Sequence, residues 1–195
     1  MKRTLITATV LLAASVGAFA QTAASTVQRD VNQQTRIEQG LQNGSITSRE
    51  GALLERDQTK VDKLQAQALK DGKMSDAERA RLNAAQNKAS RDIKTAEHNG
   101  VNGNPQLASS QRMQADVQRN INQEKRVEGG IQKGLLTNHE VSKLERGQAK
   151  VDHKEFVAGR DGKVSAKEQA RVQHAENHQS HRIRREKTDG NVRKG

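Results

Sequence analysis

The sequence predicts an all-α protein built from two tandem copies of one three-helix unit. Residues 27–100 align with residues 117–190 at a constant offset of 90, without a gap, and 32 of the 74 aligned positions are identical. A repeat of this length indicates one structural unit written twice. Between its turns each copy is rich in Ala, Gln, Glu, Lys and Arg, which favour helices.

Each copy contains two connections with the same order of residues: a Gly, a Ser or Thr, and then a Glu. The glycine suits the left-handed position after a helix, and the hydroxyl residue with its Glu forms a capping box. The residues involved are Gly44, Thr47 and Glu50; Gly72, Ser75 and Glu78; Gly134, Thr137 and Glu140; and Gly162, Ser165 and Glu168. The predicted helices span 26–42, 48–70, 76–98, 112–132, 138–160 and 166–187.

Residues 1–20 have the features of a secretory signal peptide. Lys2 and Arg3 precede an apolar stretch, and Ala18-Phe19-Ala20 forms a small-x-small cleavage site. We therefore expect cleavage after Ala20 and a periplasmic or secreted protein.

The remaining chain is expected to divide into four segments: helical repeat 1, a Gly/Asn/Pro linker, helical repeat 2 and a basic tail. They span 21–98, 99–110, 111–187 and 188–195. No segment after residue 20 is apolar enough to predict a transmembrane helix.

Composition and motifs argue against several classes of function. The 195-residue chain has no Cys, so disulfides and thiolate chemistry are absent. No Ser lies in a nucleophile elbow, and there is no Gly-rich phosphate loop or His-Glu-x-x-His pattern. We therefore expect neither an enzyme nor a bound cofactor.

The predicted hydrophobic core is thin. The core stripe of the second helix is read as Leu54, Val61, Leu64 and Ala68, with Gln58 inside it. We expect either marginal stability or packing of the two copies on each other or on a partner.

The loop around Asp71 shares the second half of an EF-hand pattern. Gln67 and Leu69 fall at loop positions one and three, where calcium needs oxygen ligands. Helix capping explains Asp71, Gly72 and Glu78 without missing parts, so the sequence favours capping over calcium binding at this loop.

The order Arg36-Ile-Glu-Gln-Gly40, Thr-x-x-Glu and Asp-Gly-x-x-Ser-x-x-Glu resembles a family of uncharacterised secreted proteobacterial proteins with tandem helical repeats. This resemblance covers nearly the whole chain after residue 20 and implies a helical fold but no activity. Leu136-Thr137-Asn138-His139-Glu140 is also similar to the Leu-Thr-x-x-Gln motif of periplasmic stress chaperones, which implies a role in envelope stress.

Histidines of the second copy are the candidate metal ligands. His174, His178 and His181 are spaced to share one helical face, and an antiparallel hairpin could bring His153 close to them. Imidazoles so placed suit Zn²⁺, Cu²⁺ or Ni²⁺. The corresponding positions of the first copy are mostly basic, which favours a solvated cationic face instead.

The basic excess lies mainly in the second half. Residues 21–110 hold 13 basic and 11 acidic residues, a net charge of +2, and residues 111–195 hold 19 and 12, a net charge of +7. This excess favours an anionic envelope surface or an envelope protein as partner, and self-association is also possible. Phe156 is the only aromatic residue after Phe19, so a nucleic-acid stacking platform is not expected.

Five polar residues of the second helix recur in the second copy. Glu55, Arg56, Gln58, Lys60 and Asp62 correspond to Glu145, Arg146, Gln148, Lys150 and Asp152. They fit a polar docking stripe, or surface ion pairs with one semi-buried Gln, and the sequence favours the ion pairs.

Two hypotheses of function follow from these observations. The first is a non-catalytic periplasmic binding or interaction protein linked to envelope stress. The second is transition-metal binding or buffering through His153, His174, His178 and His181.

Overall fold

The computed structural model describes residues 14–191 of the chain, and side chains from Ala23 onward. The n-region of the predicted signal peptide and the last four residues of the basic tail lie outside the described residues. The described part contains six α-helices and no strand, which confirms the predicted all-α fold. The helices are α1 (Ala14–Asn43), α2 (Ser48–Ala68), α3 (Asp76–His98), α4 (Ala108–Gln132), α5 (Asn138–Gly159) and α6 (Ala166–Thr188).

The helix ends follow the predicted capping pattern. All four capping boxes form, with the hydroxyls of Thr47, Ser75, Thr137 and Ser165 accepting from the backbone N–H three residues later. The glycines that precede them, Gly44, Gly72, Gly134 and Gly162, all have positive φ. The predicted boundaries agree with the observed ones within two residues, except at the starts of α1 and α4.

Those two helices start earlier than the sequence suggested. The first, α1, starts at Ala14 and runs through the predicted cleavage position, and α4 starts at Ala108, inside the predicted linker. The rest of the linker is held against the turn between α1 and α2. Gly103 N–H donates to the Gly44 carbonyl at 2.8 Å, and the Asn99 side chain donates to Glu50 at 2.6 Å.

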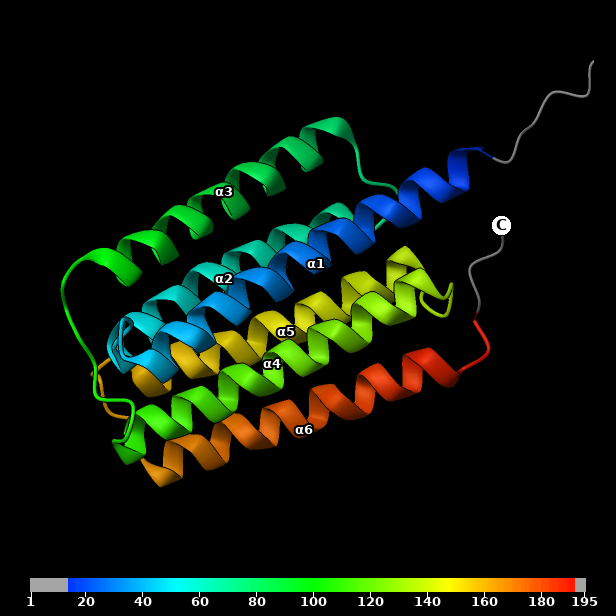
Figure 1. Ribbon diagram of the computed structural model, residues 1–195. Helices are drawn as coiled ribbons and strands as arrows, with labels where there is room; N and C mark the ends of the chain where they lie inside the picture. Colours follow the sequence, from blue (N-terminus) through cyan, green and yellow to red (C-terminus); the bar gives the residue numbers. More distant parts are fainter. Residues whose placement is uncertain (1–13, 192–195) are drawn as a thin grey trace, which may run out of the picture.

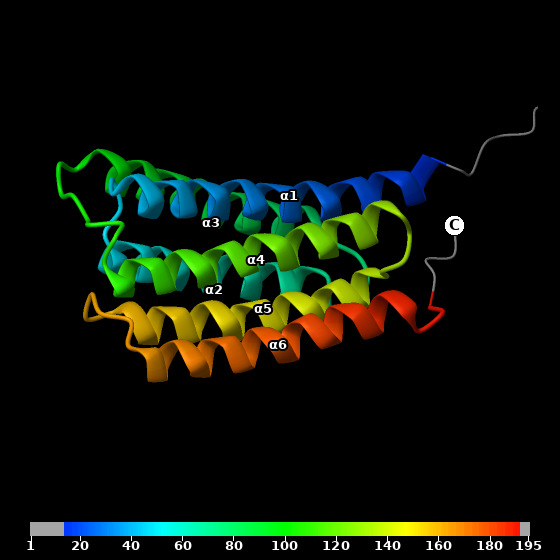
Figure 2. The ribbon, with the colours of Figure 1, turned by 60° about the horizontal axis from the view of Figure 1, so that its bottom comes forward.

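The two repeats pack tightly on each other. Helices α2 and α5 run antiparallel along each other, as do α1 and α4, and these two pairs share the largest helix contacts in the molecule. Together the four helices form a bundle to which each repeat contributes a hairpin. The third helix of each repeat lies outside: α3 covers α1 and α2, and α6 covers α4 and α5 (Figures 1 and 2).

Apolar side chains gather at the two ends of this bundle in separate clusters. One cluster includes Val27, Val61 and Leu144, and the other includes Ile37, Leu54 and Val117. Both clusters take residues from both repeats, because the antiparallel arrangement brings opposite ends of the repeats together. The predicted core stripe of α2 is confirmed, since Leu54, Val61 and Ala68 are buried and Leu64 packs against the cluster that contains Val61 and Ala68.

Gly159 sets the closest approach between the repeats at one end. A Cβ atom at this position would lie 2.8 Å from the Ala52 Cβ and 2.3 Å from the Met113 Cε. An alanine Cβ moves only with its helix, so Gly159→Ala must push α5 away from α2. We expect the free energy of unfolding to fall by about 1–3 kcal/mol, measured by urea denaturation.

The matched control for this substitution is Gly129→Ala, in the interior of α4, where an added Cβ meets nothing within 4 Å. Alanine is the better helix former there, so this variant should gain up to about 1 kcal/mol. Equal stability of the two variants would show that the helix spacing at Gly159 is not constrained.

Candidate functional site

A layer of polar side chains crosses the middle of the four-helix bundle, between the two apolar clusters. Seven carboxyl side chains are buried in it, each no more than 3% exposed. We call these seven residues the acidic layer: Asp30, Glu55, Asp62, Glu124, Glu145, Asp152 and Glu155. They come from α1, α2, α4 and α5, three from repeat 1 and four from repeat 2, so both repeats build the layer.

Buried positive charge does not balance the acidic layer. Within residues 23–191 no Lys, Arg or His side chain is buried, and none of the seven carboxyl groups forms an ion pair. Buried carboxylates that do form ion pairs lie outside the layer: Glu176 is 3.1 Å from the Arg119 Nε, and Asp57 is 2.6 Å from the Lys60 Nζ. An isolated buried carboxylate is strongly unfavourable. Protons or a bound cation must therefore neutralise the layer.

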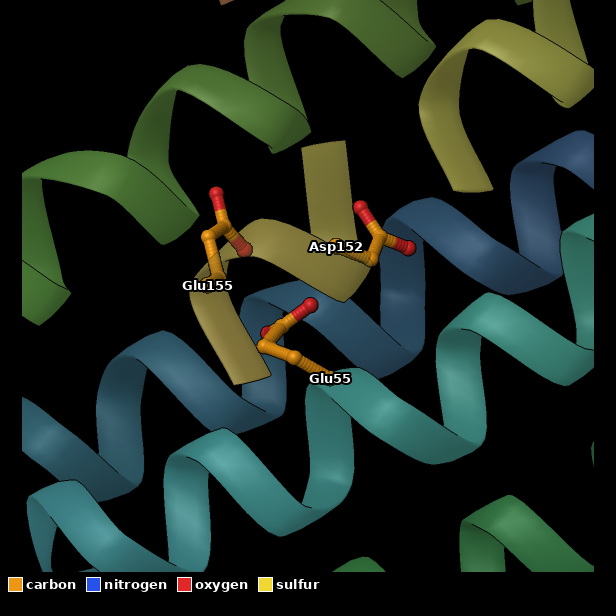
Figure 3. Close-up of side chains that lie close together, drawn as sticks. All are labelled: Glu55, Asp152 and Glu155. Carbon is orange, nitrogen blue, oxygen red and sulfur yellow. The ribbon is translucent and has the colours of Figure 1, made fainter. Parts of the chain in front are cut away.

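Three of these carboxyl groups converge at one point. Glu55 of α2 faces Asp152 and Glu155 of α5, and one ligand oxygen from each lies within 4.8 Å of the other two (Figure 3). Two ligands on opposite sides of an ion with 2.3–2.6 Å bonds are separated by about 5 Å, so this spacing matches a shared cation.

Buried amides hold the three carboxyl groups in place. Gln34 donates to the Glu55 Oε2 at 2.9 Å, and Gln148 donates to the Asp152 Oδ1 at 3.1 Å. Asn120 donates to the Glu155 Oε2 at 2.7 Å and to Asp152 at 3.3 Å. Each carboxyl group therefore has one oxygen that is oriented by an amide.

The other oxygen of each carboxyl group receives no nitrogen or hydroxyl donor. These oxygens are the Glu55 Oε1, the Asp152 Oδ2 and the Glu155 Oε1. The Asn120 side-chain oxygen is also buried without a partner. Buried polar atoms are rarely left unpaired. Unpaired oxygens on all three converging carboxyl groups indicate a place where a cation would satisfy them.

The repeat generates a second, inexact copy of this arrangement. Glu55, Asp152 and Glu155 correspond to Glu145, Asp62 and Gln65. Gln65 is fully buried and neither of its amide atoms has a partner, and the same is true of both oxygens of Glu145. Among the residues described, no three Asp, Glu or His ligand atoms come within 4.8 Å of one another in this second half.

Burial raises the pKa of every carboxyl group in the layer. The loss of hydration raises the pKa of Asp30 to about 8 and that of Asp152 to about 7. Burial, and then the charge of nearby carboxylates, raises the pKa of Glu55, Asp62, Glu124, Glu145 and Glu155 well above the ordinary range. Carboxyl groups of Asp62 and Asp152, and of Glu55 and Glu155, lie close enough to share a proton.

The sequence-based expectation of ion pairs was wrong for Glu55 and Asp62 and for their counterparts Glu145 and Asp152. All four face the bundle, because α2 and α5 are covered by a neighbouring helix on almost every side. Gln58, expected to be semi-buried, is 1% exposed. One sequence signal could have revealed this: Glu55 follows Leu54 and Asp62 follows Val61, so the acids border the apolar stripe in both copies.

The histidines proposed as metal ligands lie on the surface. His174 and His178 of α6 line a groove against α5, whereas His153 lies beside Phe156, with ring centroids 6.1 Å apart. Like these three, His181 is exposed. Over the described residues, no group of three His, Asp or Glu ligand atoms within 4.8 Å includes a histidine.

The EF-hand-like turns act as caps, as the sequence favoured. The Asp71 Oδ1 accepts from the Lys73 N–H and Glu78 completes the capping box. A second group of three acids is formed by Glu140, Glu186 and Asp189, with one carboxylate oxygen of each within 4.8 Å of the other two. There, Glu140 is already bonded to Thr137 in a capping box, and Asp189 is exposed.

Comparison of the chain with protein-family models, with curated proteins and with solved structures finds no match. None of the helices in residues 14–191 combines the length and apolar character required to cross a bilayer.

Proton uptake by the acidic layer predicts that the cation-free protein is more stable in mild acid. The folded-state pKa of Asp30 is about 8, against 3.8 ordinarily, so its stabilising contribution is complete below pH 4 and is lost as the pH rises through 8. For Asp30 alone, raising the pH from 5 to 8 should lower the free energy of unfolding by on the order of 4 kcal/mol, since one pKa unit corresponds to about 1.4 kcal/mol. Urea denaturation with a chelator present measures this.

Asp30→Asn tests the assignment, because repeat 2 already has Asn120 at the equivalent position. This variant should lose part of the pH dependence. Asp76→Asn, at a fully solvated carboxylate with 98% side-chain exposure, should leave it intact. A wild-type protein that is equally stable at both pH values would exclude protonated carboxyl groups in the core.

Proposed function

We propose that this chain is a periplasmic, non-catalytic binding protein that holds a hard divalent cation inside its helical bundle. One observation supports this most directly: three buried carboxyl groups converge, with unpaired oxygens and no positive side chain to neutralise them. A cation at this point would neutralise the charge and would satisfy the unpaired oxygens together.

The donor atoms define the chemical class of the ion. Glu55, Asp152 and Glu155 offer only oxygen, and so does the neighbouring side-chain carbonyl of Asn120. Oxygen-only sites suit Ca²⁺, Mg²⁺ and Mn²⁺, whereas Zn²⁺ and Cu²⁺ prefer imidazole or thiolate ligands. Three converging carboxylates form a charged donor set, which favours Ca²⁺ or Mn²⁺ over the more strongly hydrated Mg²⁺.

The position of the site connects cation binding to the fold. Glu55 comes from repeat 1, and Asp152 and Glu155 come from repeat 2. A bound ion would therefore link the two repeats at their widest contact, between α2 and α5. Because the ion would bind the folded protein only, its binding free energy would add to the stability of the bundle.

The second half of the layer is less suited to a cation. Gln65 replaces the carboxylate that Glu155 provides, so only two of the three equivalent side chains are acids. We therefore expect one ion per chain, with the remaining carboxyl groups neutralised by protons at neutral pH. Helical bundles commonly form metal and ligand sites from side chains on facing helices.

Cation binding can be tested by calorimetry and thermal unfolding at pH 7.5. We expect Ca²⁺ or Mn²⁺ to bind with a stoichiometry of one and to raise the melting temperature. Glu155→Gln, which copies the natural Gln65 of repeat 1, should weaken binding at least about ten-fold, a loss of about 1.4 kcal/mol, because it removes one of three charged ligands.

The same variant separates cation binding from a purely structural role. Without a cation, Glu155→Gln should be at least as stable as the wild type at pH 8, since it removes a buried acid. Asp76→Asn should bind as the wild type does. If millimolar Ca²⁺, Mn²⁺ and Mg²⁺ all leave the melting temperature of the wild type unchanged, the proposed function is wrong.

A further inference from the structure

A groove between α5 and α6 is lined by positive side chains and contains no acid. Its volume is about 220 Å³. Gly147, Lys150 and Lys154 of α5 line one wall, and His174, His178 and Arg182 of α6 line the other. In the described part of the chain none of these five cationic or titratable side chains forms an ion pair.

The corresponding surface of repeat 1 is neutralised. There, Lys60 pairs with Asp57 at 2.6 Å, and Lys88 pairs with Asp92. In repeat 2 the two acids are replaced: Gly147 stands at the position of Asp57 and Arg182 at that of Asp92. Lys150 keeps the position of Lys60, so the groove has lost both counter-charges and has gained a guanidinium.

Two further replacements increase the positive charge of the groove. Lys154 stands where repeat 1 has Leu64, and His174 stands where it has Ala84. One change goes the other way, because His178 stands where repeat 1 has Lys88. With histidines taken as neutral, the lining residues still go from no net charge in repeat 1 to +3 in repeat 2, so the exchanges as a whole favour anion binding. A solvated helix surface has no need for such one-sided replacement, because mixed charges solvate equally well.

Gly147 and Arg182 also give the groove its shape. A Cβ atom at Gly147 would lie 2.1 Å from the Gln179 Oε1 and 2.9 Å from the Arg182 Nη1. The glycine therefore lets the Arg182 side chain lie down on α5, where its Nη2 donates to the Lys143 carbonyl at 3.0 Å. This contact holds the half-buried guanidinium in place with donors remaining for a ligand, since an arginine carries five N–H donors.

From this geometry we infer that the α5–α6 groove is a binding site for a phosphate group. The planar guanidinium of Arg182 suits two oxygens of a phosphate, and Lys150 and Lys154 supply point charges beside it. The groove is smaller than typical pockets for drug-sized ligands, so it fits a phosphate with a small substituent. A free phosphate ester and the headgroup of an anionic phospholipid both present this chemistry.

The site is independent of the acidic layer, because it lies on the surface face of α5 and uses none of the buried carboxyl groups. The experiment is done with a chelator present, so its outcome does not depend on cation binding. Inorganic phosphate and glycerol phosphate are titrated into the purified protein by calorimetry in a phosphate-free buffer. Vesicles of phosphatidylglycerol, with phosphatidylcholine vesicles as the neutral reference, form the second arm.

Matched lysines in the two repeats provide the decisive comparison. Lys150→Gln should weaken phosphate binding several-fold, and Arg182→Asp, which restores the acid of repeat 1, should weaken it by roughly ten-fold or more because it removes a charge-assisted pair. Lys60→Gln changes the net charge equally but should leave binding unaltered. All three residues are at least partly exposed, so the variants should fold, as circular dichroism would verify.

The titrations distinguish a soluble phosphate ester from a lipid headgroup. Binding of glycerol phosphate without binding of phosphatidylglycerol vesicles supports a soluble phosphate ester as ligand. Binding of the anionic vesicles that is lost in Arg182→Asp supports a lipid headgroup. Equal weakening by Lys60→Gln and Lys150→Gln, or no binding of either probe, would overturn the inference.

Discussion

The structure depends on the burial of seven carboxyl groups at the contact between the two repeats. Each burial is unfavourable on its own, and no Lys, Arg or His side chain of residues 23–191 is buried to compensate for it. The layer is tolerable only when protons or an ion neutralise it, so the contact between α2 and α5 is coupled to the chemical conditions around the protein. In this chain, folding and binding are therefore expected to be linked.

The apolar clusters on either side of the layer hold it in place. Each cluster combines residues of both repeats, such as Val27 with Leu144 and Ile37 with Val117, so neither repeat can separate without exposing both clusters. Buried amides such as Asn120 and Gln34 then orient the carboxyl groups. A polar layer enclosed between two dry clusters has fixed geometry, and this is what a selective cation site requires.

Divergence between the two repeats has placed different chemical groups at equivalent positions. In the core, an acid of one repeat corresponds to an amide of the other: Glu155 of repeat 2 corresponds to Gln65 of repeat 1, and Asn120 of repeat 2 corresponds to Asp30 of repeat 1. On the surface, Asp92 corresponds to Arg182, which changes a neutral groove into a positive one. The common helical frame conserves the packing, whereas these exchanges distribute negative charge in the interior and positive charge on one face.

The sequence by itself determined the repeat, the six helices and their caps, because these depend on local interactions. The glycine C-caps and the capping boxes at Thr47 and Ser75 involve residues only a few positions apart, so their spacing is sufficient to predict them. Only the tertiary structure decided which face of α2 and α5 is buried. Glu55 and Asp62 have the spacing of ordinary surface acids, and it is the packing of α5 from the other repeat that encloses them. The convergence of Glu55 with Asp152 and Glu155 joins residues about a hundred positions apart in the chain, and no local pattern encodes such a contact.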